Sequence, residues 1–206
     1  MVGVKNPNTR MKCLRWLSDN YGWKTGLELG VKIGETTFHL MKNTKLNMTV
    51  VDAWEVQNDN PEYHWQYNEK PQWSGGDTFV PWDHNANEQK FREGAKEWGD
   101  RIKIIKGRSL AIIDQIPDKS MDFIFHDSDH SYPFVKNEIE SFMCKLKEGG
   151  VICGDDITWQ PVRQSVEEVF GKIGKEWAKM FGIIKHKKKL VESNFNSDIY
   201  YNIIDQ

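Results

Sequence analysis

The fold of this chain is decided by residues 26–37, which read GLELGVKIGETT. The apolar residues before Gly30 predict a short buried strand, and Gly30 permits the tight turn that follows it. Gly34 lets the start of the next element lie close to a ligand, and Glu35 suits the N-terminus of a helix. Because Lys32 occupies the middle glycine position, this is not the GxGxxG motif of dinucleotide enzymes. The pattern fits either a nucleoside site or a strand-to-helix turn without a ligand.

Outward from this stretch, buried strands and amphipathic helices alternate along the chain. Strands are expected at residues 26–29, 47–52, 102–105, 121–125 and 151–153. Helices are expected at residues 8–21, 35–43, 91–98, 135–146 and 162–177. This order predicts an α/β fold of the Rossmann-like, doubly wound type, with a mostly parallel sheet covered by helices on both faces. Two late strands near 182–190 and 198–204 have a short connection without a helix, so we expect an antiparallel C-terminal hairpin.

Length and composition limit the class of protein. The chain has 206 residues and a formal net charge of -2, which favours a single domain over residues 1–206 and argues against a nucleic-acid partner. Its three cysteines are too few and too irregularly spaced for a disulfide scaffold or a zinc finger. No run approaches about 18 consecutive apolar residues, and the N-terminus lacks the apolar core of a signal peptide. We therefore expect a cytoplasmic protein without a membrane partner; the oligomeric state stays open, with a homodimer among the alternatives.

An aromatic-rich insertion at about residues 55–85 interrupts the alternation. Five of the nine tryptophans fall between residues 53 and 100, where ten acidic residues outnumber four basic ones. Disordered segments are poor in aromatic residues, so we interpret the insertion as ordered. It is expected either to contact the substrate or to form a small core of its own or an oligomer interface. A basic run at residues 172–189 is interpreted as a solvated surface.

Two groups of acidic residues follow the predicted strands. Asp52 ends the second strand 22 residues after Gly30, near the spacing at which an acidic side chain meets ribose hydroxyls; the alternative is a loop cap. Asp127 follows the fourth strand, and the pair Asp155 and Asp156 follows the fifth, which should be its neighbour. Three carboxylates around one point suit a hard divalent cation such as Mg²⁺ or Ca²⁺. The alternative is that these residues cap the adjacent helices.

Together the motifs resemble those of the class I S-adenosylmethionine-dependent methyltransferases, in particular a small O-methyltransferase-like branch. The glycine motif of that branch, E-x-G-x-x-x-G-x-[ST]-[ST], corresponds to residues 28–37, and its D-x-D-H-S-Y motif corresponds to residues 127–132. Residues 146–152, LKEGGVI, resemble a further motif, L-K-P-G-G-x-I, with Glu148 in place of the usual proline. The resemblance covers residues 25 to about 173 and does not reach the insertion. It implies a seven-stranded sheet whose last strand pair is antiparallel.

The resemblance also implies roles for individual residues. It assigns cofactor binding to Glu28, Gly30, Gly34 and Thr36 of the glycine motif, Asp52 at the ribose, Ala53 and Trp54 beside adenine, Arg108 and Ser109 at the adenine edge, and Asp127 facing the reacting methyl group. Asp127, Asp155 and Asp156 correspond to acids that hold a divalent cation in metal-dependent relatives, whereas other relatives are not clearly metal enzymes. Asp156 stands where some of the metal-dependent relatives have asparagine.

His130 is the candidate catalytic base, with Asp127 to orient it; the alternative for His130 is packing at a helix entry. Methyl transfer from a sulfonium mostly requires an acceptor atom held in line, and a hydroxyl acceptor also needs a base or a metal. We expect a methyltransferase that uses S-adenosylmethionine to O-methylate a small hydroxylated molecule, either a carbohydrate or an aryl diol. The alternatives are a cofactor-binding module of the same fold without catalysis, and an NAD-dependent oxidoreductase, against which the missing GxGxxG motif argues.

Overall fold

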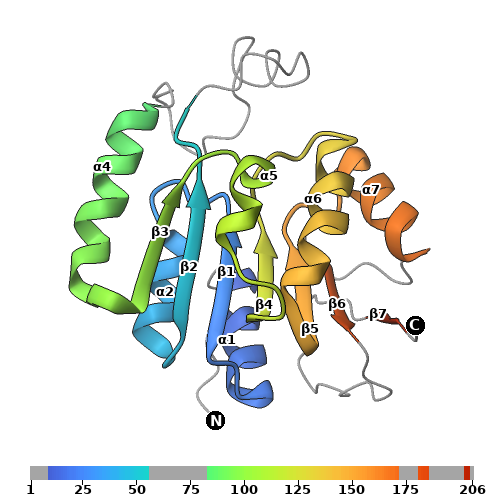
Figure 1. Ribbon diagram of the computed structural model, residues 1–206, viewed down its shortest axis with the longest axis horizontal. Helices are drawn as coiled ribbons and strands as arrows, with labels where there is room; N and C mark the ends of the chain where they lie inside the picture. Colours follow the sequence, from blue (N-terminus) through green and yellow to red (C-terminus); the bar gives the residue numbers. More distant parts are fainter. Residues whose placement is uncertain (1–8, 56–82, 172–180, 186–201, 205–206) are drawn as a thin grey trace.

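A computed structural model describes residues 9–55, 83–171, 181–185 and 202–204 of the chain. Five parallel strands form the main part of the sheet, in the order β3-β2-β1-β4-β5 (Figure 1). These strands are β1 (Thr25–Leu29), β2 (Asn47–Asp52), β3 (Ile102–Lys106), β4 (Met121–His126) and β5 (Leu146–Gly154). The predicted Rossmann-like parallel sheet is confirmed.

Helices cover both faces of this sheet (Figure 1). One face packs against α1 (Thr9–Tyr21), α2 (Glu35–Asn43) and α4 (His84–Ala95), through buried residues such as Leu14, Leu40 and Phe91. The other face packs against α5 (Ser109–Ile112), α6 (Phe134–Phe142) and α7 (Gln160–Phe170), through residues such as Ile112, Ile139 and Val166. Three short 3₁₀ turns complete the described helices: η1 (Lys96–Arg101), η2 (Ile113–Gln115) and η3 (Met143–Lys145). The predicted double winding is therefore confirmed.

The two layers of core follow from the alternation of side chains along each strand. In β4, Phe123 and Phe125 join the core under α1 and α2, whereas Ile124 joins the core under α6, and all three are fully buried. Phe123 stacks on Trp23, with ring centroids 4.5 Å apart. Gly26 of β1 makes room for this ring, because a Cβ at Gly26 would lie 2.2 Å from it.

The carboxyl ends of the central strands meet at one edge of the sheet. Backbone hydrogen bonds join the residues at these ends: Gly30 N to Val51 O (2.9 Å), Asp127 N to Leu29 O (2.8 Å), Gly107 N to Asp52 O (2.9 Å) and Asp155 N to His126 O (3.0 Å). The strand order reverses between β1 and β4, because the chain builds outward to β3 and then continues on the other side of β1. Ligands of open α/β sheets bind at such a switch point, so the site is expected at the loops after β1 and β4.

The C-terminal strands differ from the prediction. β6 (Phe181–Lys185) runs antiparallel to β5, and β7 (Asn202–Ile204) pairs with β6 in parallel. The predicted antiparallel hairpin of the last two strands is therefore wrong, although the described strands do form one seven-stranded sheet. The described parts of these two strands are Phe181–Lys185 and Asn202–Ile204, and the connection between them includes residues 186–201, which lie outside the described ranges. A parallel pair needs a connection of roughly a dozen residues or more, and this one is long enough.

Two helices are shorter than predicted. α6 ends at Phe142, because the chain passes through η3 and already enters β5 at Leu146, which pairs with the start of β4. α7 ends at Phe170, because Gly171 adopts a left-handed φ of 82° and its N–H bonds to the carbonyl of Glu167.

Two features of the sequence fall on residues that the structure does not describe. Residues 56–82, most of the aromatic insertion, lie outside the described ranges, and so do residues 172–180 and 186–189 of the basic run. Within the described ranges, every helix is too short or too polar to cross a membrane.

Candidate active site

The glycine turn after β1 rests directly on the loop after β4. Gly30 adopts a φ of 82°, and a Cβ there would lie 2.1 Å from the backbone oxygen of Asp127. Gly34 adopts a φ of 89° as the N-cap of α2, and it has no side chain to cap the first turn of that helix. Thr36, in this first turn, is buried. The backbone N–H groups at the start of α2 therefore stand beside the switch point without a side-chain cap.

Asp52 organises the glycine turn from the end of β2. Its Oδ2 accepts hydrogen bonds from the backbone N–H groups of Val31 and Lys32, both at 2.8 Å. Its Oδ1 accepts one from the backbone N–H of Trp54 at 2.8 Å. This is the loop-capping role that the sequence left as the alternative. A carboxylate has roughly four acceptor positions, so Oδ1 keeps one position for a further donor.

Trp54 and Ala53, the pair predicted to flank adenine, differ in their exposure. The Trp54 ring is buried and packs on Phe91 of α4, with ring centroids 5.5 Å apart. Its indole Nε1–H donates to the carbonyl of Lys32 at 2.8 Å, and its backbone adopts a φ of 44°. The left-handed backbone turns this ring into the core, whereas Ala53 is half-buried at the open edge.

Arg108 and Ser109, predicted at the adenine edge, point to different surroundings. Arg108 is half-exposed, and its Nε donates to the Glu55 carboxylate at 2.9 Å. Ser109 begins α5 and is buried, and its hydroxyl donates to the carboxylate of Glu138 on α6. Ser109 therefore belongs to an internal network.

That network is a buried group of polar side chains beneath the end of β4. The Nε2 of His126 contacts the carboxylate of Glu138, and neither side chain is more than 1% exposed. Ser109 and Ser128 both donate to the Glu138 carboxylate, the latter at 2.7 Å. Glu138 was not among the residues predicted from the sequence, although it lies on the apolar stripe of α6, between Val135 and Phe142. A carboxylate on such a stripe signals a buried polar partner.

Arg10 is the second residue that the sequence analysis missed. It lies in the first turn of α1, and its Nη1 contacts Asp127 Oδ2 at 3.0 Å and Asp155 Oδ2 at 2.5 Å. Arg10 precedes the buried Leu14 and Leu17 by four and seven residues, so it too falls on the apolar face of its helix. The guanidinium reaches across more than a hundred residues of sequence to join the ends of β4 and β5.

His130 lies beside the acid cluster, by which we mean Asp127, Asp155 and Asp156. Its Nε2 is 3.7 Å from Asp127 Oδ1 and 3.5 Å from Asp156 Oδ2, and its ring lies 5.4 Å from that of Trp159. Burial and, to a lesser extent, the nearby His126 lower the pKa of His130 to about 4. The imidazole is therefore neutral at pH 7, and its Nε2 has no hydrogen-bond partner among the described residues.

Burial also shifts the acids of the site toward their protonated forms. It raises the pKa of Asp127, and the Arg10 guanidinium opposes this shift. Glu28 is fully buried on β1, where burial raises its pKa to about 7 against the opposing hydrogen bond from Thr37 and the charge of Arg10. Carboxyl groups that titrate near neutrality are common at functional sites.

The predicted divalent-cation site does not fit the residues present. Arg10 already contacts the carboxylates of Asp127 and Asp155, while Asp156 lies beside His130. Among the described residues, which include all three acids, no group of three or more His, Cys, Asp and Glu side chains is arranged to hold a metal ion. The structure brings the acids to one edge, as predicted, but around an arginine and a histidine.

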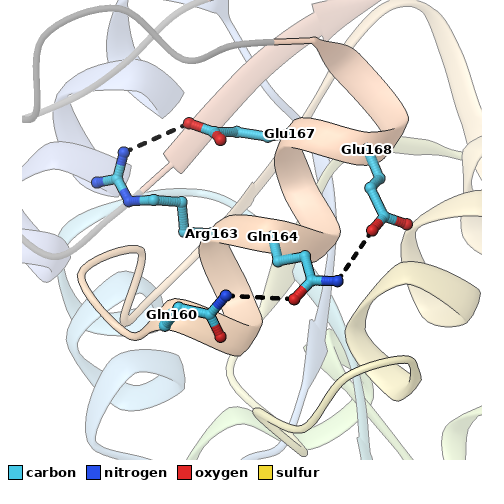
Figure 2. A pocket seen from close by; sticks show the side chains of 5 residues that line it. All are labelled: Gln160, Arg163, Gln164, Glu167 and Glu168. Atoms are coloured by element: carbon cyan, nitrogen blue, oxygen red, sulfur yellow. Dashed lines mark hydrogen bonds and ion pairs between the residues drawn. The ribbon is translucent and has the colours of Figure 1, made fainter.

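A hollow of about 300 Å³ lies elsewhere, along α7 (Figure 2). Its lining consists of five polar side chains of that helix: Gln160, Arg163, Gln164, Glu167 and Glu168. Figure 2 shows that hydrogen bonds and an ion pair join these side chains to others of the same set, for example the hydrogen bond that Gln164 donates to Glu168 at 3.0 Å. None of the predicted site residues lines it, so we place the candidate active site at the strand ends.

Comparisons with known proteins find solved structures of similar fold. The chain is similar in structure to an O-methyltransferase from Bacillus cereus in complex with SAH, with 19% identity over 80% of this chain and 68% of that one and a TM-score of 0.55. It is also similar to a putative caffeoyl-CoA O-methyltransferase from Staphylococcus aureus, with 18% identity, coverage of 82% and 72%, and a TM-score of 0.53. The O-methyltransferase TomG from Streptomyces achromogenes, in complex with SAM, gives 15% identity, coverage of 85% and 72%, and a TM-score of 0.55.

These likenesses establish the fold. No curated protein matches the chain in sequence. The model of the family described as "Methyltransferase domain" matches residues 27–157, which is more than half of the chain and includes the glycine turn, Asp52 and the acid cluster. The chain therefore belongs to the methyltransferase-domain family.

Proposed function

We propose that this methyltransferase transfers the methyl group of S-adenosylmethionine to a hydroxyl of a small molecule, either a carbohydrate or an aryl diol. The observation that carries the proposal is the meeting of the glycine turn, Asp52 and the acid cluster at the switch point between β1 and β4. The similar structures named above are O-methyltransferases, two of them with SAM or SAH bound, which supports this donor and a hydroxyl acceptor.

The residues at the strand ends suit the chemical groups of S-adenosylmethionine. Asp52 retains an acceptor position for a ribose hydroxyl, in addition to its three backbone hydrogen bonds. The uncapped N-terminus of α2, at Gly34 and Thr36, suits a carboxylate such as that of the methionine moiety. We assign Glu28, Gly30 and the half-buried Ala53, which belong to or follow β1 and β2, to the rest of the donor-binding site. When bound, this donor supplies a methyl group that is already activated by its sulfonium.

The acceptor hydroxyl must lose its proton, and His130 is the group for this step. Its Nε2 is neutral and has no hydrogen-bond partner among the described residues, so it can accept a proton from a hydroxyl. Asp127 and Asp156 stand 3.7 and 3.5 Å from this nitrogen and would stabilise the imidazolium that results. Asp127 is thus the second catalytic candidate.

Calorimetric titration with S-adenosylmethionine tests the donor assignment. We expect Asp52→Ala to weaken binding by about tenfold or more, because a hydrogen bond to a charged group contributes about 1.5 kcal/mol or more. Asp114→Ala removes an exposed carboxylate from η2 and serves as the matched control, with unchanged affinity. Equal affinities of the wild-type and Asp52→Ala proteins would contradict the assignment.

Turnover separates the proposal from a binding module of the same fold. The protein is incubated with S-adenosylmethionine and a panel of sugars and aryl diols, and formation of S-adenosylhomocysteine and methyl ether is measured. We expect product with at least one panel member, and about a hundredfold less with His130→Ala. Tight binding without product from any hydroxylated acceptor would favour the inactive module.

A further inference from the structure

We propose that the guanidinium of Arg10 is the resident cation of the acid cluster and stands in this protein where a divalent metal ion would otherwise bridge Asp127 and Asp155. The proposal rests on the proposed function for its catalytic meaning, but cation binding can be measured without methyl transfer.

The Arg10 guanidinium and a bridging metal ion cannot bind Asp127 and Asp155 at the same time. A single nitrogen, Arg10 Nη1, lies 3.0 Å from Asp127 Oδ2 and 2.5 Å from Asp155 Oδ2. A magnesium ion that bridged the same two oxygens would need to sit about 2.1 Å from each of them. The ion and the nitrogen would occupy the same space, so a metal could enter only after Arg10 had left.

Burial makes the arginine a fixed part of the site. The side chains of Arg10, Asp127 and Asp155 are only 20%, 19% and 12% exposed. Acids that are removed from water need a compensating charge, and an arginine stays charged at any pH at which the protein is folded. α1 holds the guanidinium in place, because Leu14 and Leu17 of the same helix are fully buried.

The contact with Arg10 also leaves one oxygen of Asp127 available to His130. Arg10 engages Oδ2 of Asp127, while Oδ1 of the same carboxylate faces His130 at 3.7 Å. Asp156, the third acid, lies next to His130. Arg10 is therefore a positioning residue that orients Asp127 toward the candidate base, and methyl transfer should proceed without a divalent cation.

Removing the guanidinium should convert the site into one that binds metal. Arg10→Gln leaves two carboxylates and a neutral side chain, and Mn²⁺ is the probe because its electron paramagnetic resonance signal reports binding. We expect Arg10→Gln to gain about tenfold or more in Mn²⁺ affinity over the wild type. We also expect its Tm in EDTA to fall by about 5 °C or more and to recover in part with Mg²⁺. Adding Asp155→Asn to Arg10→Gln should abolish both the gain and the recovery.

Two further variants serve as controls. Arg15→Gln removes an exposed arginine from the same helix and should resemble the wild type in both assays. Arg10→Lys keeps the positive charge, so it should exclude Mn²⁺ and retain most of the stability. The wild type itself should have the same Tm in Mg²⁺ and in EDTA.

Two results would overturn the proposal. One is a wild-type protein that binds Mn²⁺ and loses this binding with Asp155→Asn; this arm needs no Arg10 variant, so a failure of Arg10→Gln to fold leaves it decisive. The other is an Arg10→Gln protein that keeps both the stability and the weak Mn²⁺ affinity of the wild type. If no acceptor is ever methylated but these cation measurements come out as expected, the proposed function fails and the cation assignment stands.

Discussion

Replacing Glu28 with glutamine should make the stability of the protein less dependent on pH. Glu28 is fully buried on β1, and its carboxylate accepts a hydrogen bond from the hydroxyl of Thr37. Burial raises its pKa from an ordinary value of 4.5 to about 7 in the folded protein. Between these two pH values the folded state keeps a proton that the unfolded state has lost. The free energy of unfolding therefore falls as pH rises through this window.

The size of the effect follows from the shift in pKa. Each unit corresponds to about 1.4 kcal/mol, so the shift of Glu28 amounts to about 3 kcal/mol. A glutamine resembles the protonated acid, since its amide oxygen can still accept from Thr37, but it does not titrate. We therefore expect Glu28→Gln to match the wild type near pH 4.5 and to exceed its free energy of unfolding by about 3 kcal/mol above pH 7.

Urea unfolding at a series of pH values measures this difference directly. Groups whose pKa does not depend on Glu28 contribute equally to both proteins and cancel in the comparison. His130 is one of them: with its lowered pKa it destabilises both proteins as pH falls from 6.5 toward about 4. Glu97→Gln, which changes an exposed residue of η1, is the control and should show no such trend. A difference between Glu28→Gln and the wild type that stays constant across this pH range would refute the reasoning from burial.

Three further substitutions test the packing of the site by urea unfolding. Gly30→Ala should destabilise the protein by about 3 kcal/mol or more, because the added Cβ would collide with the backbone of the loop after β4. Gly171 has a similar φ but open space around it, so Gly171→Ala should cost only about 1 kcal/mol. Equal losses of stability in the two variants would contradict this reasoning. Glu138→Gln should cost about 1–3 kcal/mol, because the amide nitrogen of glutamine cannot accept the hydrogen bonds that both carboxylate oxygens accept from Ser109 and Ser128, and a loss near zero would mean that the network contributes nothing. Trp54→Phe should cost about 1 kcal/mol for the lost indole hydrogen bond, and no loss would count against that bond.

The sheet could be predicted from the sequence because its signals are local. Each parallel strand shows a short apolar run bounded by glycine or an acidic residue, and the predicted bounds of β2 and α2 agree with the structure. The pairing of β7 could not be predicted in this way. It depends on where two short strands end, which sequence patterns define poorly, and the length of the connection then decides whether a parallel pair is feasible.

The candidate site could also be predicted only in part. The acids at the strand ends were found because strand order alone brings them together. Arg10 and Glu138 were not, because a charged residue on an apolar stripe signals a buried polar partner without showing which other element supplies it. The metal prediction rested on the number of carboxylates, and number alone cannot reveal that an arginine 145 residues away neutralises one of them.

The Arg10 contacts have a consequence for the order of folding. They close loops of 117 and 145 residues, and because closing such long loops costs chain entropy, we expect them to form late, once β4 and β5 have joined the sheet. Contacts of such long range tend to be absent from the transition state, and their loss then accelerates unfolding while leaving the rate of folding almost unchanged. The charged end of α1 would thus dock last during folding. Its contacts would then set how slowly the completed fold unfolds.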